Sequence, residues 1–416
     1  MNETDFSPID GASWRRYVAV FCCCSAATLV AVSCLNYTVD PYLTHQWDSP
    51  LLQRMRPTRE KLSAWGKTYA VAKYRPTVVY VGNSRTELGL PVDMPMFAGK
   101  TVFNTAVSGA ALGEVITLVQ HAARMSRLET VIWGIDAPTF SMKTGSAGLE
   151  PELTNSGPFF FFRRAVLNLK RGLTVDMTED SLRVLSGSFG DVCRSSLAFY
   201  GQRDDACFNN RKVGWNNTTT AMGPRLREFR RGDGPTVAAM LAFEATLTGL
   251  CRAGTKIRLY INPTHALTLD ALYWVGKWAP MEQWQTELAR MGERYRAGGC
   301  DLRLYDFSGF NSVTTETIPL ASRRRVMDHY WEASHYRANV GRMILGRIYA
   351  DPRQRQALPP DFGVELDSAM LPAHLARMRA ARDRYHVEHA QETAYLRAVL
   401  ATPADSTQTS VAGLQE

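Results

Sequence analysis

A charge-free segment near the start of the chain, from Tyr17 to Leu35, sets the strongest limit on how this sequence can fold. Its residues are apolar or small, and a helix of this length is near the shortest that crosses a bilayer core of about 30 Å. Trp14 and Tyr37 flank it, as aromatic side chains do at membrane interfaces. A cleaved signal peptide is the alternative, but the segment is longer than a typical signal core and no clean small-x-small cleavage site follows. We therefore predict a retained transmembrane helix at residues 17–35.

The charges beside this segment predict its orientation. Arg15 and Arg16 precede it and Asp40 follows it, and basic residues favour the cytoplasmic side. We expect residues 1–16 to be a cytoplasmic tail and residues 36–75 to be a stalk with a lead-in helix. The main domain would then lie outside a bacterial-type cytoplasmic membrane, in the periplasm, on a chain that crosses the membrane once.

The composition suits a folded domain behind that anchor. The chain has 416 residues, 45% of them hydrophobic, and a net charge of +8. A basic surface favours anionic partners such as phospholipid headgroups or acidic polysaccharide. We expect the membrane as a partner, and a polysaccharide or an acyl-donor membrane protein as a second one. Nucleic acid is not expected outside the cytoplasm, and the densest basic stretch, Arg225 to Arg231, is interpreted as a solvated helix face.

Four cysteines lie beyond the membrane segment, where an oxidising compartment favours disulfides. They are Cys193, Cys207, Cys251 and Cys300. Cys251 and Cys300 each end a predicted helix just ahead of a predicted strand, so both fall at the same edge of the sheet. We predict that they pair with each other, and that Cys193 pairs with Cys207.

No metal or other cofactor is expected. The outer cysteines have no C-x-x-C pair, and their spacings are wide for zinc. His386 and His389 are three residues apart on a charged helix, which is geometry that could hold a metal, but we interpret them as part of a solvated helix face. The cysteines at positions 22, 23, 24 and 34 lie in the membrane segment, as small apolar residues or palmitoylation targets.

Strand and helix patterns alternate through the outer domain. Short β-branched runs predict strands, and apolar residues at helical spacing predict the helices between them. The predicted strands are at 78–81, 101–104, 130–135, 256–261 and 302–305, and the predicted helices at 113–128, 236–252, 281–296 and 338–348. This alternation predicts an α/β fold with a parallel sheet covered on both faces, spanning residues 76–350.

Two segments do not follow the alternation. Residues 141–235 form an insertion that could cap a site or bind a partner, and its run Phe159 to Phe162 is interpreted as core. Residues 351–416 form a C-terminal extension, with a long charged helix or hairpin at 368–400 and a disordered tail after it.

Two motifs point to chemistry at one edge of this sheet. Gly82-Asn83-Ser84 follows the first strand, and Glu332 stands three residues before His335. A serine nucleophile needs a base to take its proton, and the base needs a partner to hold its tautomer. Ser84, His335 and Glu332 could supply these roles, and Asp328-His329 is a competing acid–base pair.

Further polar residues are expected near the same edge, because sites in open α/β sheets form where strands end. They follow the ends of predicted strands or stand next to Ser84. The candidates are Gly109, Asp136, Asn104, His265 and Arg85. His265 could equally be a loop residue that holds a backbone carbonyl, and the more expected role for Arg85 is a structural ion pair.

These blocks resemble the SGNH (GDSL-like) hydrolase superfamily, and more narrowly its membrane-anchored, extracytoplasmic relatives of polysaccharide O-acetylation and D-alanylation. The resemblance covers residues 78–136 and 256–348. It implies a three-layer α/β/α sandwich, Ser84 as nucleophile and Gly109 as a donor to the oxyanion. It also implies that Glu332 and His335 fill the final D-x-x-H block, with glutamate in place of aspartate.

One departure from the family pattern concerns the third block, which usually ends in an asparagine that donates to the oxyanion. Here it reads Gly134-Ile135-Asp136. An ionised aspartate only accepts hydrogen bonds and would repel developing negative charge. Asp136 must therefore be protonated, turned away or used differently. We expect an acyl transferase or esterase acting on envelope polysaccharide or a similar acylated substrate, or else a catalytically degenerate relative that binds glycan or scaffolds an assembly complex.

Overall fold

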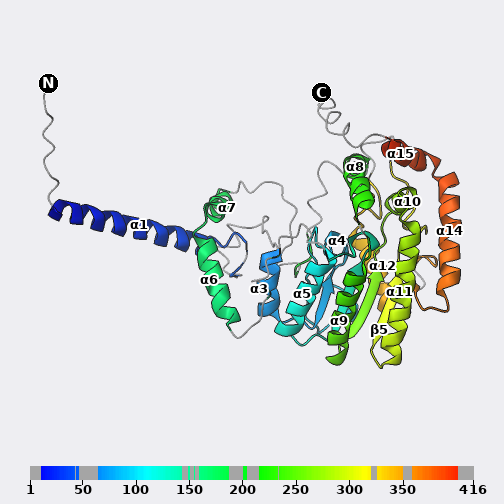
Figure 1. The fold of residues 1–416 in the computed structure, drawn as a ribbon, viewed down its shortest axis with the longest axis horizontal. Helices are drawn as coiled ribbons and strands as arrows, with labels where there is room; N and C mark the ends of the chain where they lie inside the picture. The colour runs from blue at the N-terminus through cyan, green and yellow to red at the C-terminus, as the bar shows by residue number, and fades with distance from the viewer. Residues whose placement is uncertain are drawn as a thin grey trace, which may run out of the picture. The chain divides into compact units, whose positions relative to one another are not determined.

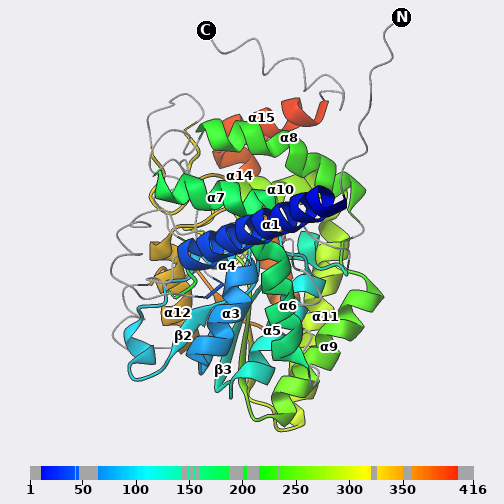
Figure 2. The same cartoon turned by 90° about the vertical axis from the view of Figure 1, so that its left-hand side faces the viewer.

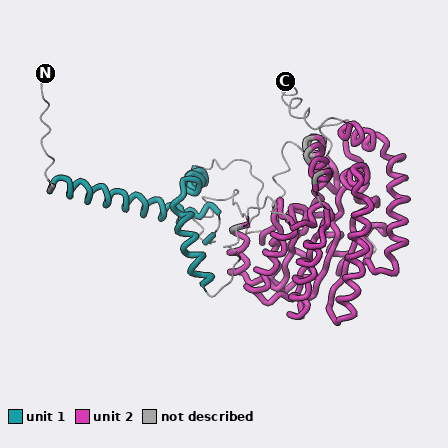
Figure 3. The backbone as a smooth tube through the Cα atoms, viewed as in Figure 1, with its two compact units in different colours: residues 1–61, 157–192 teal, residues 62–156, 193–416 magenta. Residues whose placement is uncertain are grey.

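A computed structural model describes most of the chain and divides it into two compact units. The described residues are 11–42, 44–45, 64–142, 149, 154, 159–186, 200–203, 215–232, 234–319, 326–349 and 358–401. The first unit joins residues 1–61 to residues 157–192, and the second comprises residues 62–156 and 193–416 (Figure 3). The predicted insertion at 141–235 is thus shared between the units. Cys193 and Cys207 lie outside the described residues, as does the predicted disordered tail.

The first unit is built on helix α1, Gly11–Val39. Within residues 12–39, an 18-residue window has a mean hydropathy of 2.3. Among the described residues, α1 is a helix long and apolar enough to cross a membrane. Helices α6, Phe160–Gly172, and α7, Val175–Leu185, pack against it. Asn36 joins the three helices: its amide donates to Gly172 O and Thr178 Oγ1, both at 2.9 Å, and its Oδ1 accepts from Ser181 at 2.8 Å.

The second unit is an α/β fold around a six-stranded, mostly parallel sheet, as the alternation predicted. The strands run in the order β2-β1-β3-β4-β5-β6, and only β6 is antiparallel. Their bounds are Val78–Val81 (β1), Val102–Asn104 (β2), Thr130–Ile135 (β3), Lys256–Ile261 (β4), Leu302–Asp306 (β5) and Val364–Glu365 (β6). Every residue of β1, β2 and β3 is buried, which explains why these runs are mostly apolar and do not alternate between apolar and polar residues.

Helices connect and cover these strands (Figures 1 and 2). α3 packs on α5, α5 packs on α9, and α11 packs on β5. Their bounds are Ala64–Tyr74 (α3), Leu112–Met125 (α5), Val237–Arg252 (α9) and Trp278–Ala297 (α11). Two further helices meet each other, α4 at Ser84–Gly89 and α12 at Ala338–Tyr349. Their backbones approach closely at Gly89 and Gly341: a Cβ atom added to Gly341 would collide with the backbone of Gly89.

The C-terminal extension was predicted to be a long helix or a helical hairpin, and the structure shows the hairpin. Its helices are α14, Leu371–Glu388, and α15, Ala390–Ala401. His374 Nε2 lies 2.9 Å from Asp306 at the end of β5, and His386 Nε2 lies 2.7 Å from the buried Asp270. Asp270 belongs to α10, Ala266–Trp274. The interpretation of His386 as part of a solvated face was therefore wrong, since it joins the hairpin to the core.

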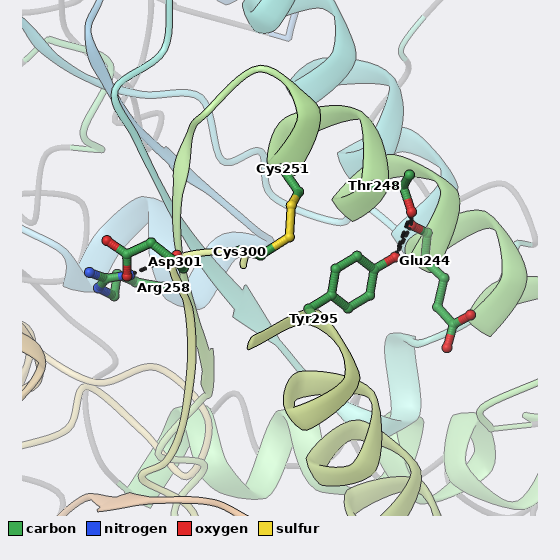
Figure 4. Close-up of a disulfide and its surroundings, with 7 residues drawn as sticks. All are labelled: Glu244, Thr248, Cys251, Arg258, Tyr295, Cys300 and Asp301. Carbon is green, nitrogen blue, oxygen red and sulfur yellow. Dashed lines mark hydrogen bonds and ion pairs between the residues drawn. A yellow bond between two sulfur atoms is a disulfide. The ribbon is translucent and has the colours of Figure 1, made fainter. Parts of the chain in front are cut away.

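The amino-terminal edge of the sheet carries the predicted disulfide (Figure 4). Cys251 and Cys300 are bonded, with Cα atoms 5.5 Å apart. The prediction is confirmed for this pair, and its reason holds: β4 and β5 are neighbours in register, so the helix ends that precede them meet. Beside the bond, Tyr295 OH shares a 2.7 Å hydrogen bond with Thr248, and Arg258 pairs with Asp301 at 2.8 Å.

Candidate active site

Ser84 stands at the first position of α4, directly after the turn that ends β1. Asn83 caps this helix, and its Oδ1 accepts from the N–H of Arg85 at 3.0 Å. Glycine is needed at two places beneath the turn. Gly82 has a φ of +153°, and a Cβ on either Gly82 or Gly134 would lie within 2.4 Å of Thr86 Oγ1. The turn is therefore fixed by local geometry that presents the serine at the strand end.

Glu332 and His335 lie in the loop that leads into α12, and several hydrogen bonds fix this loop. Trp331 N–H donates to the carbonyl of His335 at 2.9 Å, closing it on itself. Ala333 holds its middle, because its carbonyl accepts from Thr268 at 2.6 Å and its N–H donates to Thr218 Oγ1 at 3.2 Å. Thr218 belongs to α8, Trp215–Arg231. A loop held on both sides gives its side chains little freedom to move.

The two motifs, which are 251 residues apart, meet at hydrogen-bond distance. His335 Nε2 lies 2.8 Å from Ser84 Oγ, and His335 Nδ1 is hydrogen-bonded to Glu332 Oε1. A carboxylate can only accept, so Nδ1 carries the proton and Nε2 is left to accept from the serine hydroxyl. The same Glu332 oxygen also accepts from the backbone N–H of His335 at 3.0 Å. Asp328 is exposed, and His329 Nδ1 instead lies 3.1 Å from Asn339.

Buried charges keep Glu332 ionised. Burial by itself raises the pKa of this carboxyl, but His335, Arg225 and Arg85 outweigh it and lower the pKa to about 2. Arg225 Nη1 lies 3.9 Å from Glu332 Oε2, an oxygen that has no hydrogen-bond partner within the described part of the chain. Arg225 was expected on a solvated face, and that expectation was wrong: its side chain is only 17% exposed.

Asp136 is bound by three donors. Asn83 and Asn262 donate amide N–H groups to its Oδ2 at 2.8 and 2.9 Å, and Arg85 Nη1 lies 3.1 Å from its Oδ1. Of the three alternatives for this residue, the structure favours a different use: the carboxylate is the buried counter-ion of Arg85. Arg85 in turn donates to both Ser334 O and Ser334 Oγ, at 3.2 and 3.0 Å.

The Arg85–Asp136 pair therefore links the two halves of the site, since Arg85 follows Ser84 and Ser334 precedes His335. Arg85 takes the structural ion-pair role that was expected of it. Arg85 and Asp136 also line a small cavity whose other walls are mostly apolar. They include Ile261, Leu269, Leu272, Met281 and Trp284.

A chain of buried hydrogen bonds supports Asp136 from beneath. Tyr260 OH shares hydrogen bonds with Thr86 Oγ1 at 2.8 Å and with Tyr336 OH at 3.2 Å. Tyr336 OH then donates to Asn262 Oδ1 at 3.2 Å, and Asn262 donates to Asp136. Burial raises the pKa of both phenols, so they stay neutral donors. The chain connects α4, β4 and the loop before α12.

The loop after β2, which carries Gly109, is fastened beside the serine turn. Val107 N–H donates to Gly82 O at 3.2 Å. Glu87 holds the next residue, because its Oε2 accepts from the N–H and hydroxyl of Ser108 at 2.9 and 2.6 Å. Gly109 has a φ of +75°, a conformation that favours glycine. Its role as a donor stays a prediction.

Glu87 is itself neutralised by Lys67, whose Nζ lies 2.8 Å away and is fully buried. Burial would raise the pKa of Glu87, but Lys67, Arg203 and Ser108 bring it below its ordinary value. Lys67 and Glu87 were not identified from the sequence. They are 20 residues apart, and no local sequence pattern indicates that they form a pair.

Asn104 and His265 have structural roles. Asn104 Nδ2 donates to Thr86 O at 3.0 Å, and its Oδ1 accepts from Ala106 N–H at 3.1 Å, so both ends of its amide bind backbone. His265 caps α10, with Nδ1 accepting from Leu267 N–H at 3.1 Å and Nε2 donating to Glu316 O at 2.6 Å. Burial lowers its pKa. The alternative in which His265 holds a backbone carbonyl is the one observed.

No protein-family model and no curated protein matches the chain significantly. Within the described residues, no three His, Cys, Asp or Glu side chains are grouped so as to hold a metal ion. What the site can do chemically therefore follows from its own contacts.

Proposed function

We propose that the protein is a membrane-anchored acyl transferase or esterase of SGNH type, acting through Ser84, His335 and Glu332. One observation carries the proposal: the continuous contact from the Ser84 hydroxyl to His335 and on to the ionised Glu332. Serine–histidine pairs occur by chance, but a histidine whose second nitrogen is held by a buried carboxylate meets the requirement for a general base.

In the proposed reaction, Ser84 Oγ attacks the carbonyl carbon of an acyl ester while His335 Nε2 takes the hydroxyl proton. The carbonyl re-forms as the bond to the leaving alkoxide breaks, and His335 returns the proton to that oxygen. A sugar hydroxyl or water then attacks the acyl-serine and gives its proton to His335. The bond between the acyl carbon and Ser84 Oγ breaks, and His335 returns the proton to that oxygen, which regenerates Ser84. Transfer and hydrolysis differ only in which acceptor arrives. Glu332 keeps the imidazole in the required tautomer.

The oxyanion would be held by backbone N–H groups rather than by Asp136. Ser84 N–H is in the first turn of α4, where N–H groups have no acceptor within the helix. Gly109 N–H would be the second donor, from the loop fixed by Glu87. With Asp136 held by Arg85, its negative charge is compensated, which removes the main objection to catalysis. The degenerate-scaffold alternative is less favoured for that reason.

The finer parts of the fold and location belong to the same proposal. α4 and α12 would cover the sheet face opposite α5, α9 and α11, completing a three-layer sandwich of SGNH type. α1 would cross the cytoplasmic membrane once with residues 1–16 inside, so that Ser84 acts in the periplasm on envelope polysaccharide. The Cys251–Cys300 disulfide supports an oxidising compartment.

Release of p-nitrophenol from p-nitrophenyl acetate tests the chemistry. The full chain in detergent or membrane vesicles should release it faster than the Ser84→Ala variant does. Arg230→Gln is a matched control, because Arg230 is exposed and donates a hydrogen bond to the backbone carbonyl of Leu400. Turnover that is equal in wild type and Ser84→Ala would reject the enzyme and leave the scaffold.

A further inference from the structure

Helix α6 carries an apolar face that is exposed within the described part of the chain. Phe162, Val166, Leu169 and Leu173 are spaced at i, i+4, i+7 and i+11, so they lie in one line along the helix and just past its end. We call these four residues the apolar stripe. Their exposed fractions are 69, 38, 59 and 40%, and the neighbouring Phe161 is 74% exposed. The phenylalanine run was expected in the core, and only Phe160 is there; Phe159, Phe161 and Phe162 are exposed.

Basic residues border the apolar stripe. Arg163 and Lys170 are seven residues apart, so they lie in line along one flank of it, and both are exposed. The sequence of α6 also holds Arg164 and Arg171, and it contains no acidic residue. A helix with large apolar side chains on one face and lysine or arginine beside them is typical of segments that lie in a membrane interface.

The position at which α6 contacts α1 indicates how deep α6 would lie in the membrane. Gly172, at the end of α6, accepts a hydrogen bond from Asn36, and its Cα faces Ser33. From Arg16 to Asn36 is about 20 residues, or about 30 Å of helix, which matches the thickness of a bilayer core. If Arg16 marks the inner boundary, Asn36 marks the outer one, and α6 leaves α1 at that level.

The direction of α6 agrees with this depth. In both views α6 runs across the line of α1 rather than along it (Figures 1 and 2). A helix that crosses a membrane-spanning helix in this way lies roughly in the plane of the membrane, at the boundary between acyl chains and headgroups.

We propose that α6 is an interfacial helix, with the apolar stripe embedded in the outer leaflet and Arg163 and Lys170 on anionic headgroups. This rests on the proposed span by α1, which the stripe extends. The occupant is lipid, because α6 packs against a helix that is itself exposed and apolar, and because its flank is basic where lipid headgroups are acidic. The proposal gives the first unit a second attachment and fixes its tilt.

Photo-crosslinking of the full chain tests it. Benzoylphenylalanine is installed in place of Phe162 or, separately, Leu169, and the protein is reconstituted in vesicles of equal parts phosphatidylethanolamine and phosphatidylglycerol. Phe21, in α1, is the positive control, and Glu179, exposed on α7, is the negative one. Mass spectrometry should find phospholipid adducts when the probe is at Phe162, Leu169 or Phe21. It should find none when the probe is at Glu179.

The outcomes separate the two proposals. Lipid adducts at Phe21 with none at Phe162 and Leu169 would overturn the interfacial helix alone. Adducts to a second copy or to another protein at Phe162 would overturn it too, in favour of a protein interface. No lipid adduct at Phe21 would reject the membrane span itself, without bearing on Ser84.

The headgroup contact has its own readout. Adducts at Phe162 should be richer in phosphatidylglycerol than adducts at Phe21, and Arg163→Gln with Lys170→Gln should abolish that enrichment. Equal proportions at the two positions in the unchanged protein would contradict the basic flank's role.

Discussion

The two edges of the sheet are held in different ways. At the amino-terminal edge, a disulfide joins the two segments that lead from α9 into β4 and from α11 into β5. Beside it, Arg258 pairs with Asp301, whose side chain is about half exposed to solvent. At the carboxyl-terminal edge, the Arg85–Asp136 pair is buried, and the donors to Asp136 come from two distant parts of the chain: Asn83 and Arg85 flank Ser84, and Asn262 follows β4.

This difference separates stability from chemistry. A covalent bond constrains the unfolded chain and needs no charge in the interior, whereas a buried ion pair carries a desolvation cost that an apolar pair would avoid. Charges retained at the carboxyl-terminal edge are therefore best explained by what they position. We expect substitutions at the amino-terminal edge to change stability alone. Substitutions at the carboxyl-terminal edge should change turnover as well.

The largest expected effect is on turnover at the carboxyl-terminal edge. His335→Ala should lower the rate of acyl turnover by a factor of about 10⁴, because Ser84 then has no base. The fold should be preserved, since the His335 side chain is partly exposed. Activity and circular dichroism of the same preparation check this. His265→Ala is the contrasting variant: it removes a buried cap and should lower the melting temperature, and if it alone stopped turnover the assignment of base would be wrong.

The amino-terminal edge should show the opposite behaviour. Replacing Cys251 and Cys300 together by serine opens a loop of 49 residues, which in the chain-entropy description costs about 4 kcal/mol of unfolding free energy. Turnover per folded molecule should not change. Urea unfolding gives the first quantity and p-nitrophenyl acetate the second. A variant of unchanged stability but reduced turnover would break the proposed separation of the two edges.

Asp136→Asn should be costly, although it introduces the residue that the SGNH pattern usually has at this position. Arg85 would be left buried without its counter-ion, at a cost of about 3 kcal/mol, and turnover should fall because Arg85 also holds Ser334. The double variant Asp136→Asn with Arg85→Met removes both charges and should recover part of the stability. A gain in turnover from Asp136→Asn alone would mean that the missing oxyanion donor limits the rate.

Acid should weaken the site through Glu332. Its pKa is about 2 in the folded protein against an ordinary 4.5, so it contributes stability that is fully present above pH 4.5 and is lost as the pH falls toward 2. The size is on the order of 3 kcal/mol. The free energy of unfolding should be measured for wild type and for Glu332→Gln between about pH 6 and about pH 3. The difference between the two proteins should shrink as the pH falls. A constant difference would show that Glu332 is not held ionised.

The smallest expected effect concerns Arg225. Arg225→Gln removes a charge that lowers the pKa of Glu332 in the folded protein, so the stability that Glu332 contributes should be smaller and its loss on acidification should be complete at a higher pH. Turnover should fall about tenfold, in kcat rather than KM, because Arg225 touches Glu332 and not the reacting atoms. Arg230→Gln, on the same helix, should change neither. Equal behaviour of the two variants would remove Arg225 from the site.

Local signals were sufficient to predict much of this molecule. The strands at 78–81, 130–135 and 256–261 have the predicted bounds, because each is a run rich in β-branched, aromatic or leucine residues that ends at a turn. The Cys251–Cys300 bond was predictable because each cysteine ends a predicted helix just ahead of a predicted strand, and the two strands are neighbours in the sheet. Ser84, Glu332 and His335 were recognisable since each stands in a short motif, and the structure brings the three together.

Non-local pairing was not predictable in this way. The partner of Asp136 was missed because an arginine 51 residues earlier carries no mark of it, and the partner of His386 lies 116 residues away. Arg225 resembled any other arginine on a charged helix. β6 has two residues, too few for a pattern. Charge pairing across elements depends on the assembled fold, whereas strand and motif signals do not.

Trapping the acyl-enzyme tests the central claim most directly. The full chain is mixed with p-nitrophenyl acetate, quenched in acid at early times and digested, and the peptide that contains Ser84 is examined by mass spectrometry. The account predicts one acetyl group on Ser84 that disappears on longer incubation with acceptor and is absent from Ser84→Ala. An acetyl group on another residue, or none on Ser84 while p-nitrophenol is still released, would contradict it.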